Sequence, residues 1–226
     1  GIDDTFSIAV RELGKWIGAN GHTLIYGGSK TGLMGELAES VLMEGGRVTG
    51  VEPQFFVEAE VQYDEITELI VTKDMTERKT KMIELGDAFI AFPGGTGTLE
   101  EITEVMSKLS LNQLSAPCIF YNLNGYYDSI KEFLSHMVAM GLSTNERQKD
   151  IYFASDLTEV DNVVNKAFGN MRGEMDALAE SAIKNLGMSR LMAYQTGSTF
   201  MSMGKSMLTS CLLYTSPSPR DGATSR

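Results

Sequence analysis

A short apolar segment that runs into a glycine-rich turn constrains this chain more than any other feature. Residues 87–91 (DAFIA) are typical of a buried parallel strand, and residues 93–98 (PGGTGT) place three glycines within four positions. Apolar residues then recur at helical spacing after the turn. The local order is therefore strand, glycine turn and helix, the helix carrying Leu99, Ile102, Val105 and Met106 on one face.

This turn has the properties of an anion site. Gly94, Gly95 and Gly97 carry no Cβ, so backbone N–H groups can approach a ligand closely. We expect the helix to begin at Thr98, and the first amides of a helix have no partner inside it. Free amides at the positive end of the helix dipole favour phosphate. The alternative is a tight turn that only connects two elements; we favour phosphate.

Strands and helices alternate along most of the chain. This pattern predicts an α/β fold with a Rossmann-like, doubly wound parallel sheet and helices on both faces. Right-handed crossovers would bring a second glycine turn, residues 27–32, to the same carboxyl edge of the sheet. The other expected strands cover 23–26, 47–51, 69–71, 117–121 and 151–153, and the other expected helices cover 5–19, 33–44, 75–85, 127–140 and 157–168.

The two ends depart from this pattern. The chain opens on a helix with no strand before it, so we expect the first strand of the sheet to be missing through an N-terminal truncation. Residues 211–226 resemble the translation of a sequencing-library adapter, and we expect them to be a non-native tail outside the fold. Residues 1–170 would then form the nucleotide-binding domain. Residues 171–210 would be a helical extension of unknown role, either a native amphipathic tail or a chimeric join.

Composition excludes several classes of partner. The formal net charge is −11, which argues against nucleic acid and anionic membranes because phosphate backbones require clustered positive charge. No apolar run reaches the roughly 20 residues that span a bilayer. Cys118 lies in an apolar segment, which favours a reduced thiol and a cytoplasmic protein. His22 and His136 match no metal-ligand spacing, so we expect no metal and no cofactor.

Three separated motifs resemble one known family. Residues 76–79 (TERK) followed by residues 93–101 look like the Lonely Guy family of cytokinin riboside 5′-monophosphate phosphoribohydrolases, once described as lysine decarboxylases. Residues 26–35 and 122–127 resemble the same family, and the resemblance extends over residues 5–168. The family pattern PGGxGTxxE is met by Pro93, Gly94, Gly95, Gly97, Thr98 and Glu101.

The resemblance implies hydrolysis of the N-glycosidic bond of a purine nucleoside 5′-monophosphate, either AMP or an N6-substituted AMP. It implies Glu101 and Arg78 as catalytic residues. Glu101 follows Thr98 by about one helical turn, roughly 5 Å, which matches the reach from a 5′-phosphate to the ribose. Glu100 is the rival acid if the helix begins one residue late. The substrate-binding residues implied are Gly27, Gly28, Gly32, Met34, Gly35, Lys79, Pro93, Gly94, Gly95, Thr96, Gly97 and Thr98.

The carboxylate and the guanidinium suit this chemistry in different ways. Glycosidic cleavage passes through an oxocarbenium-like state, which a carboxylate at residue 101 would stabilise. Arg78 stays protonated, so it can donate hydrogen bonds to the purine or the phosphate but cannot exchange protons. Two other functions stay open: a nucleotide carrier such as the molybdenum-cofactor carrier proteins, and a scaffold with an inactive site. We also expect a homodimer, because the helices over 99–110 and 127–140 are rich in apolar residues and the family is dimeric.

Overall fold

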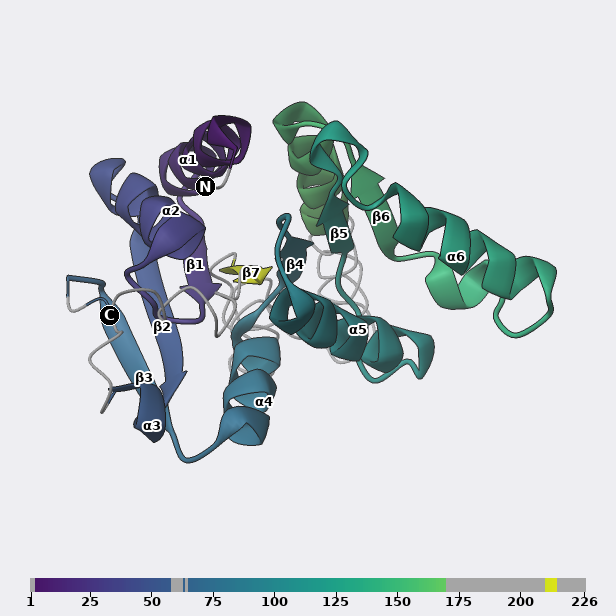
Figure 1. The fold of residues 1–226 in the computed structure, drawn as a ribbon, viewed down its shortest axis with the longest axis horizontal. Coiled ribbons are helices and arrows are strands. Elements are labelled where there is room, and N and C mark those ends of the chain that lie inside the picture. Colours follow the sequence, from purple (N-terminus) through teal and green to yellow (C-terminus); the bar gives the residue numbers. More distant parts are fainter. Residues whose placement is uncertain (1–2, 58–62, 64, 170–209, 215–226) are drawn as a thin grey trace, which may run out of the picture.

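A parallel sheet forms the centre of the computed structural model, which describes residues 3–57, 63, 65–169 and 210–214 (Figure 1). Its strands follow apolar runs of the sequence, as expected for strands buried on both faces. They are β1 (Thr23–Tyr26), β2 (Arg47–Pro53), β3 (Glu68–Thr72), β4 (Ala88–Ala91), β5 (Cys118–Tyr121), β6 (Ile151–Ala154) and β7 (Ser210–Tyr214). The strand order is β3-β2-β1-β7-β4-β5-β6, and every pairing is parallel.

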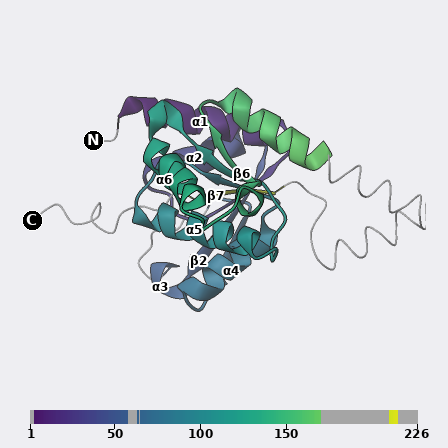
Figure 2. The same ribbon diagram turned by 90° about the vertical axis from the view of Figure 1, so that its right-hand side faces the viewer.

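Helices cover both faces of this sheet. The helices are α1 (Asp4–Ala19), α2 (Gly32–Met43), α3 (Gln54–Val57), α4 (Met75–Leu85), α5 (Thr96–Ser110), α6 (Asp128–Ala139) and one over residues 157–169. Figure 2 shows α1, α2 and the helix over 157–169 on one side of the sheet, with α4 and α5 on the other. The predicted α/β fold with a doubly wound parallel sheet is therefore confirmed.

The core is divided by the sheet into two clusters. Successive strand residues point to opposite faces, so Leu24 and Tyr26 pack with α1 and α2, whereas Ile25 packs on the other side. The same alternation separates Ile90 from Phe89 on β4. Most of the apolar face predicted for α5 lies in the second cluster, but Leu99 is 41% exposed and lies outside it. Two buried cores thus hold the carboxyl edge of the sheet in place from both sides.

Two local expectations need correction. Helix α5 begins at Thr96, not at Thr98, because Gly95 adopts the extended conformation of a helix N-cap (φ −86°, ψ −160°). The segment after Pro53 contains the short helix α3, which the sequence pattern did not predict. Neither difference moves a strand, and the earlier start of α5 adds two residues to the anion-binding end of the helix.

Residues 210–214 form strand β7, so the start of the expected tail pairs in the sheet, whereas the non-native origin of residues 211–226 stays a prediction of the sequence. The backbone of β7 pairs with β1 on one side, with Leu24 opposite Cys211, and with β4 on the other, with Phe89 opposite Leu212. Without it, β1 and β4 would each present an unpaired edge in the middle of the sheet. The position that we expected to lack a strand is therefore filled. The proposed extension over residues 171–209 and the tail over 215–226 lie outside the described residues.

Candidate active site at the glycine turns

Both glycine turns lie at the carboxyl edge of the sheet. The first, residues 27–32, follows β1, and the second follows β4 and leads into α5. Because the sheet is parallel, ligand sites form at this edge. In the second turn Pro93 and Thr98 are buried, whereas Gly95 and Thr96 are exposed. The first-turn amides of α5 are thus presented at the surface of the predicted phosphate site. Among the described residues, no helix is long and apolar enough to cross a membrane.

Two tyrosines fix the conformation of the second turn. The Tyr126 hydroxyl donates to the Gly94 carbonyl over 2.7 Å, and the Tyr127 hydroxyl donates to the Phe92 carbonyl over 2.8 Å. The Asn122 side chain accepts the Tyr127 amide over 2.6 Å and so holds these tyrosines in position. The third motif of the sequence, residues 122–127, therefore supports the glycine turn.

Helix α4 presents Arg78 to the interior. The helix begins with two side-chain caps: Asp74, the N-cap, accepts the Glu77 amide, and the Glu77 carboxylate accepts the amide of Lys73, the residue before the N-cap, each over 2.8 Å. Arg78, in the first turn, is 5% exposed. Its Nε donates to the Val51 carbonyl over 2.9 Å. Asp74 therefore caps the helix, and the Arg78 side chain is held by the backbone of β2.

The acid that pairs with Arg78 is Glu101. The Nη1 atom of Arg78 donates to Oε1 of Glu101, and the glutamate is 3% exposed. Burial raises the pKa of Glu101 above its ordinary value, and the Arg78 charge opposes that shift. The carboxylate of Glu100 is exposed at the surface instead. Of the two candidate acids, Glu101 is the one that faces inward beside Arg78.

Lys79 is brought to a different place from Arg78. Its ammonium pairs with Glu100 over 2.7 Å and with Glu104 over 3.2 Å, between α4 and α5. The hydrogen bond that Lys79 donates to Glu100 is the main cause that raises the pKa of Lys79. The structure therefore joins Arg78 and Glu101 at the turns, whereas Lys79 lies in an ion-pair network beside them.

The first turn packs closely on this pair. A Cβ built at Gly27 would lie 2.5 Å from Nη2 of Arg78, so only glycine leaves room for the guanidinium. Gly28 and Gly32 have positive φ values of 87° and 60°. On α2, Met34 is buried, and a Cβ at Gly35 would lie 2.0 Å from the Lys30 carbonyl oxygen. Of the predicted residues of the first turn, Gly27 is therefore packed directly against Arg78.

Glu52 belongs to this cluster and was missed by the sequence analysis. It lies in β2, is 2% exposed, and a Cβ at Gly28 would lie 2.4 Å from its Cγ. Burial raises the pKa of Glu52 to about 7, and the Arg78 charge partly opposes this. The available signal was an acidic residue inside an otherwise apolar strand, residues 48–53. Such a residue is expected to be paired or functional.

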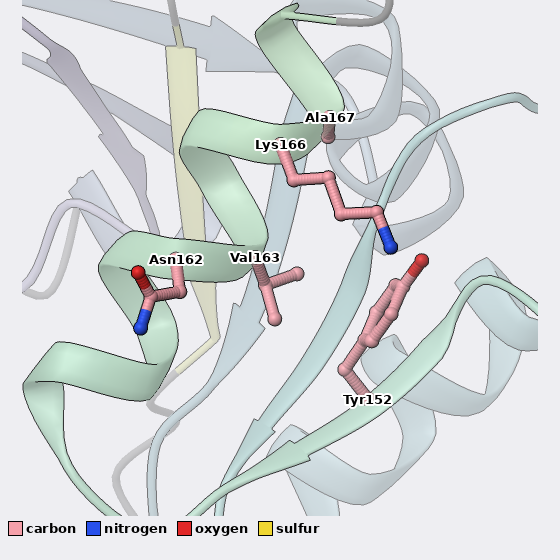
Figure 3. A pocket seen from close by; sticks show the side chains of 5 residues that line it. All are labelled: Tyr152, Asn162, Val163, Lys166 and Ala167. Carbon is pink, nitrogen blue, oxygen red and sulfur yellow. The ribbon is translucent and has the colours of Figure 1, made fainter.

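A cavity of about 190 Å³ lies elsewhere, between β6 and the helix over 157–169. Figure 3 shows the Lys166 ammonium pointing toward the Tyr152 hydroxyl across it. None of its lining residues was predicted as a site residue; they are Tyr152, Asn162, Val163, Lys166 and Ala167. Within the described ranges, no three His, Cys, Asp or Glu side chains come together as metal ligands.

Comparison with known proteins found a matching family and several relatives. The family model described as "Possible lysine decarboxylase" matches residues 34–164, which include Arg78 and Glu101. A cytokinin riboside 5′-monophosphate phosphoribohydrolase of Rhodococcoides fascians is 40% identical over 146 residues, covering 64% of this chain and 74% of the relative. The enzyme LOG4 of Arabidopsis thaliana, with the same activity in its name, is 37% identical over 149 residues, covering 66% of this chain and 69% of LOG4.

Some relatives are matched over a smaller part of their length. The probable phosphoribohydrolase LOGL9 of Oryza sativa subsp. japonica is 43% identical over 133 residues, and the match covers 59% of each chain. Among solved structures, the molybdenum cofactor carrier protein of Chlamydomonas reinhardtii superposes with a TM-score of 0.56 at 20% identity, covering 74% of this chain and 90% of the carrier. That similarity concerns the fold alone.

Proposed function

This chain belongs to the Lonely Guy family, to which the lysine decarboxylase description was once applied, and on that premise we propose that it is a nucleoside 5′-monophosphate phosphoribohydrolase. The substrate would be AMP or an N6-substituted AMP. Water would cleave the N-glycosidic bond, giving the free purine and ribose 5-phosphate. The observation that carries the proposal is the buried ion pair of Arg78 and Glu101 beside a phosphate-competent glycine turn.

The phosphate and the ribose would be held by different parts of α5. The backbone amides from Gly95 to Thr98 would bind the phosphate at the positive end of the helix. Glu101 lies about one turn further along α5, roughly 5 Å, at the distance of the ribose ring. Its carboxylate would oppose the positive charge that develops on the sugar as the bond breaks.

Arg78 would act on the leaving group. As the C1′–N9 bond breaks, its electron pair moves to the purine, and a donor that faces the ring favours this charge. A guanidinium stays protonated at neutral pH, so Arg78 supplies hydrogen bonds and charge but no proton. The water adds its oxygen to C1′, and its two protons end on the sugar hydroxyl and on the base.

A direct assay of base release tests this function. We expect adenine from AMP and the substituted base from isopentenyl-AMP, with no cytosine from CMP, when the products are separated by chromatography. Saturable AMP binding without base release would contradict hydrolysis and would favour a carrier on the same fold. A protein that neither binds AMP nor releases base would favour the inactive scaffold.

We also propose a homodimer. The α6 side chain of Phe133 is 58% exposed, and Met140 and Leu142, which follow this helix, are 63% and 79% exposed. Adjacent large apolar residues at a surface are typical of an interface with another chain. Light scattering tests this, and a monomer at micromolar concentration would contradict it. A cytoplasmic location and the absence of nucleic-acid partners stay predictions of the sequence.

A further inference from the structure

Glu52 is a buried carboxyl that the proposed reaction leaves without a role. It lies near the carboxyl end of β2 and is 2% exposed. Its Oε2 atom is enclosed and has no hydrogen-bond partner among the described residues. An unpartnered polar atom in the interior costs folding free energy, so its presence calls for a physical reason.

Arg78 is the cation whose charge lowers the pKa of Glu52. Its Nε is bonded to the carbonyl of Val51, the residue directly before Glu52, so the guanidinium is anchored next to this carboxyl. The Arg78 charge favours ionisation of Glu52, while burial opposes it. Arg78 therefore interacts with two buried carboxyls, and only the carboxylate of Glu101 forms an ion pair with it.

Two successive glycines of the first turn lie against the Arg78 guanidinium and the Glu52 carboxyl. A Cβ at Gly27 would meet Nη2 of Arg78 at 2.5 Å, and a Cβ at Gly28 would meet Cγ of Glu52 at 2.4 Å. A nucleotide bound at this turn would thus be separated from both groups by little more than the glycine backbone. Binding at the turn would therefore act on the packing around the Arg78 charge.

We propose that Glu52 is a positioning residue that accepts the Arg78 guanidinium when bound nucleotide draws Glu101 out of its ion pair. This rests on the proposed function, because only a nucleotide gives Glu101 a reason to leave Arg78. A guanidinium has five N–H donors in a planar fork, so it can bind a second carboxylate while Nε keeps its bond to Val51. Arg78 then keeps a buried counter-charge, and Glu101 can turn to the ribose.

The exchange requires ionised Glu52, because a neutral carboxyl attracts a guanidinium far less. With a pKa of about 7, Glu52 loses its proton to solvent between pH 6 and pH 8. The neighbouring titratable group on β1, Tyr26, stays neutral there because burial raises its pKa. The charged groups around Glu101 are Arg78, Glu100 and Lys79. Ionisation of Glu52 should therefore set the pH dependence of the exchange.

The test compares kcat/KM for AMP between pH 6 and pH 8 in wild type and Glu52→Gln, which keeps the shape and removes the ionisation. The ratio of the two values cancels the titration of the AMP phosphate, and kcat/KM reports groups of the free enzyme. We expect this wild-type to variant ratio to rise about tenfold across the range, following the ionised fraction of a group with a pKa near 7. A constant ratio would overturn the proposal.

Two further variants separate positioning from simple destabilisation. Glu52→Asp keeps a carboxyl and should keep the wild-type pH profile at a reduced rate. Thr72→Val removes the hydroxyl that donates to the Glu52 backbone carbonyl over 3.4 Å, and should lower the melting temperature without changing the profile. A Thr72→Val profile that matches Glu52→Gln would overturn the role of the carboxyl.

If the wild type releases no base at any pH, the proposed hydrolysis is rejected. The positioning role is then tested by measuring the Glu52 pKa directly. In that case, ¹³C NMR of labelled glutamate carboxyls, assigned with Glu52→Gln, follows the pKa of Glu52 with and without AMP. The exchange predicts a lower Glu52 pKa with AMP, because Arg78 moves onto it. An unchanged pKa with AMP bound would overturn the positioning role.

Discussion

Arg78 and Glu101 are ionic side chains held almost wholly out of water, at 5% and 3% exposure. Removing two charges from water costs several kcal/mol, and mutual attraction offsets that cost only with good geometry. Such a pair is a poor source of stability, so its position beside the phosphate-competent turn favours a functional role. The surface pair of Lys79 with Glu100 carries no comparable cost.

Breaking the buried pair should affect stability and activity differently. At about pH 6, where Glu52 is mostly protonated, Glu101→Gln leaves the Arg78 charge buried without an anion, so we expect the free energy of unfolding to fall by about 3 kcal/mol. The double variant Arg78→Gln/Glu101→Gln removes both charges and should recover most of that loss. Base release from AMP should be absent in both. Urea unfolding at 25 °C, with the AMP assay, measures the two effects.

The matched control for that series is Lys79→Gln on the same helix. Because this ammonium pairs at the protein surface, unfolding should change by less than about 1 kcal/mol. A Glu101→Gln protein as stable as wild type would contradict the buried, uncompensated charge. A double variant that releases base would show that the pair does not act in the reaction.

Single residues mark the limit of what the sequence can predict. The family pattern and the spacing from Thr98 both favoured Glu101, which the structure pairs with Arg78, but Glu100 stayed open because a helix start cannot be placed to one residue from sequence. Glu52 was not identified at all. Its effect depends on Gly28 and Arg78, which lie 24 and 26 residues away in the chain. Burial of that kind is created by the tertiary fold.

At the scale of elements, the turn between β4 and α5 has no room for a side chain at one glycine but has room for one at the next. A Cβ at Gly94 would lie 2.2 Å from Oγ1 of Thr98, whereas a Cβ at Gly95 would have nothing within 4 Å. Thr98 is 1% exposed, so it has little room to yield. The turn must therefore move if residue 94 gains a side chain.

We expect Gly94→Ala to weaken the binding of ribose 5-phosphate by about tenfold, equivalent to about 1.4 kcal/mol. The displaced turn would no longer align the α5 amides with the phosphate. Gly95→Ala is the matched control and should bind within about threefold of wild type. Calorimetry with ribose 5-phosphate avoids turnover of the ligand. Equal affinities in the two variants would contradict the assigned phosphate site.

Elements were predicted well where their periodicity is local. The strand before the glycine turn and the helix Met75–Leu85 that precedes it follow from patterns of a few residues. The conformation of the turn was not predictable in the same way. It depends on hydrogen bonds from Tyr126 and Tyr127, which come from 32 and 35 residues away.

At the scale of the whole molecule, β7 joins two halves of the sheet. On one side lie β1, β2 and β3, and on the other β4, β5 and β6. The predicted βαβ units gave the fold class, but they left the centre of the sheet without a strand. The pairing of β7 is long-range in sequence, and no local pattern specifies which edges a strand will join.

Disrupting β7 should separate the two halves. Leu212→Pro places proline opposite both Ile25 and Phe89 in a central strand, where it removes a ladder hydrogen bond. We expect the melting temperature to fall by more than about 10 °C, or cooperative unfolding to be lost. A chain that ends at Tyr214 is the control and should melt like the full chain. An unchanged melting temperature in Leu212→Pro would contradict the central position of β7.

The most direct measurement of the central claim is the quantity of adenine and ribose 5-phosphate formed from AMP by wild type and by Arg78→Gln/Glu101→Gln. The two proteins should be equally folded by circular dichroism, which separates chemistry from stability. We predict equimolar adenine and ribose 5-phosphate from wild type and neither product from the double variant. Equal product formation by both proteins, or intact AMP with folded wild type, would contradict the claim that this buried pair cleaves the glycosidic bond.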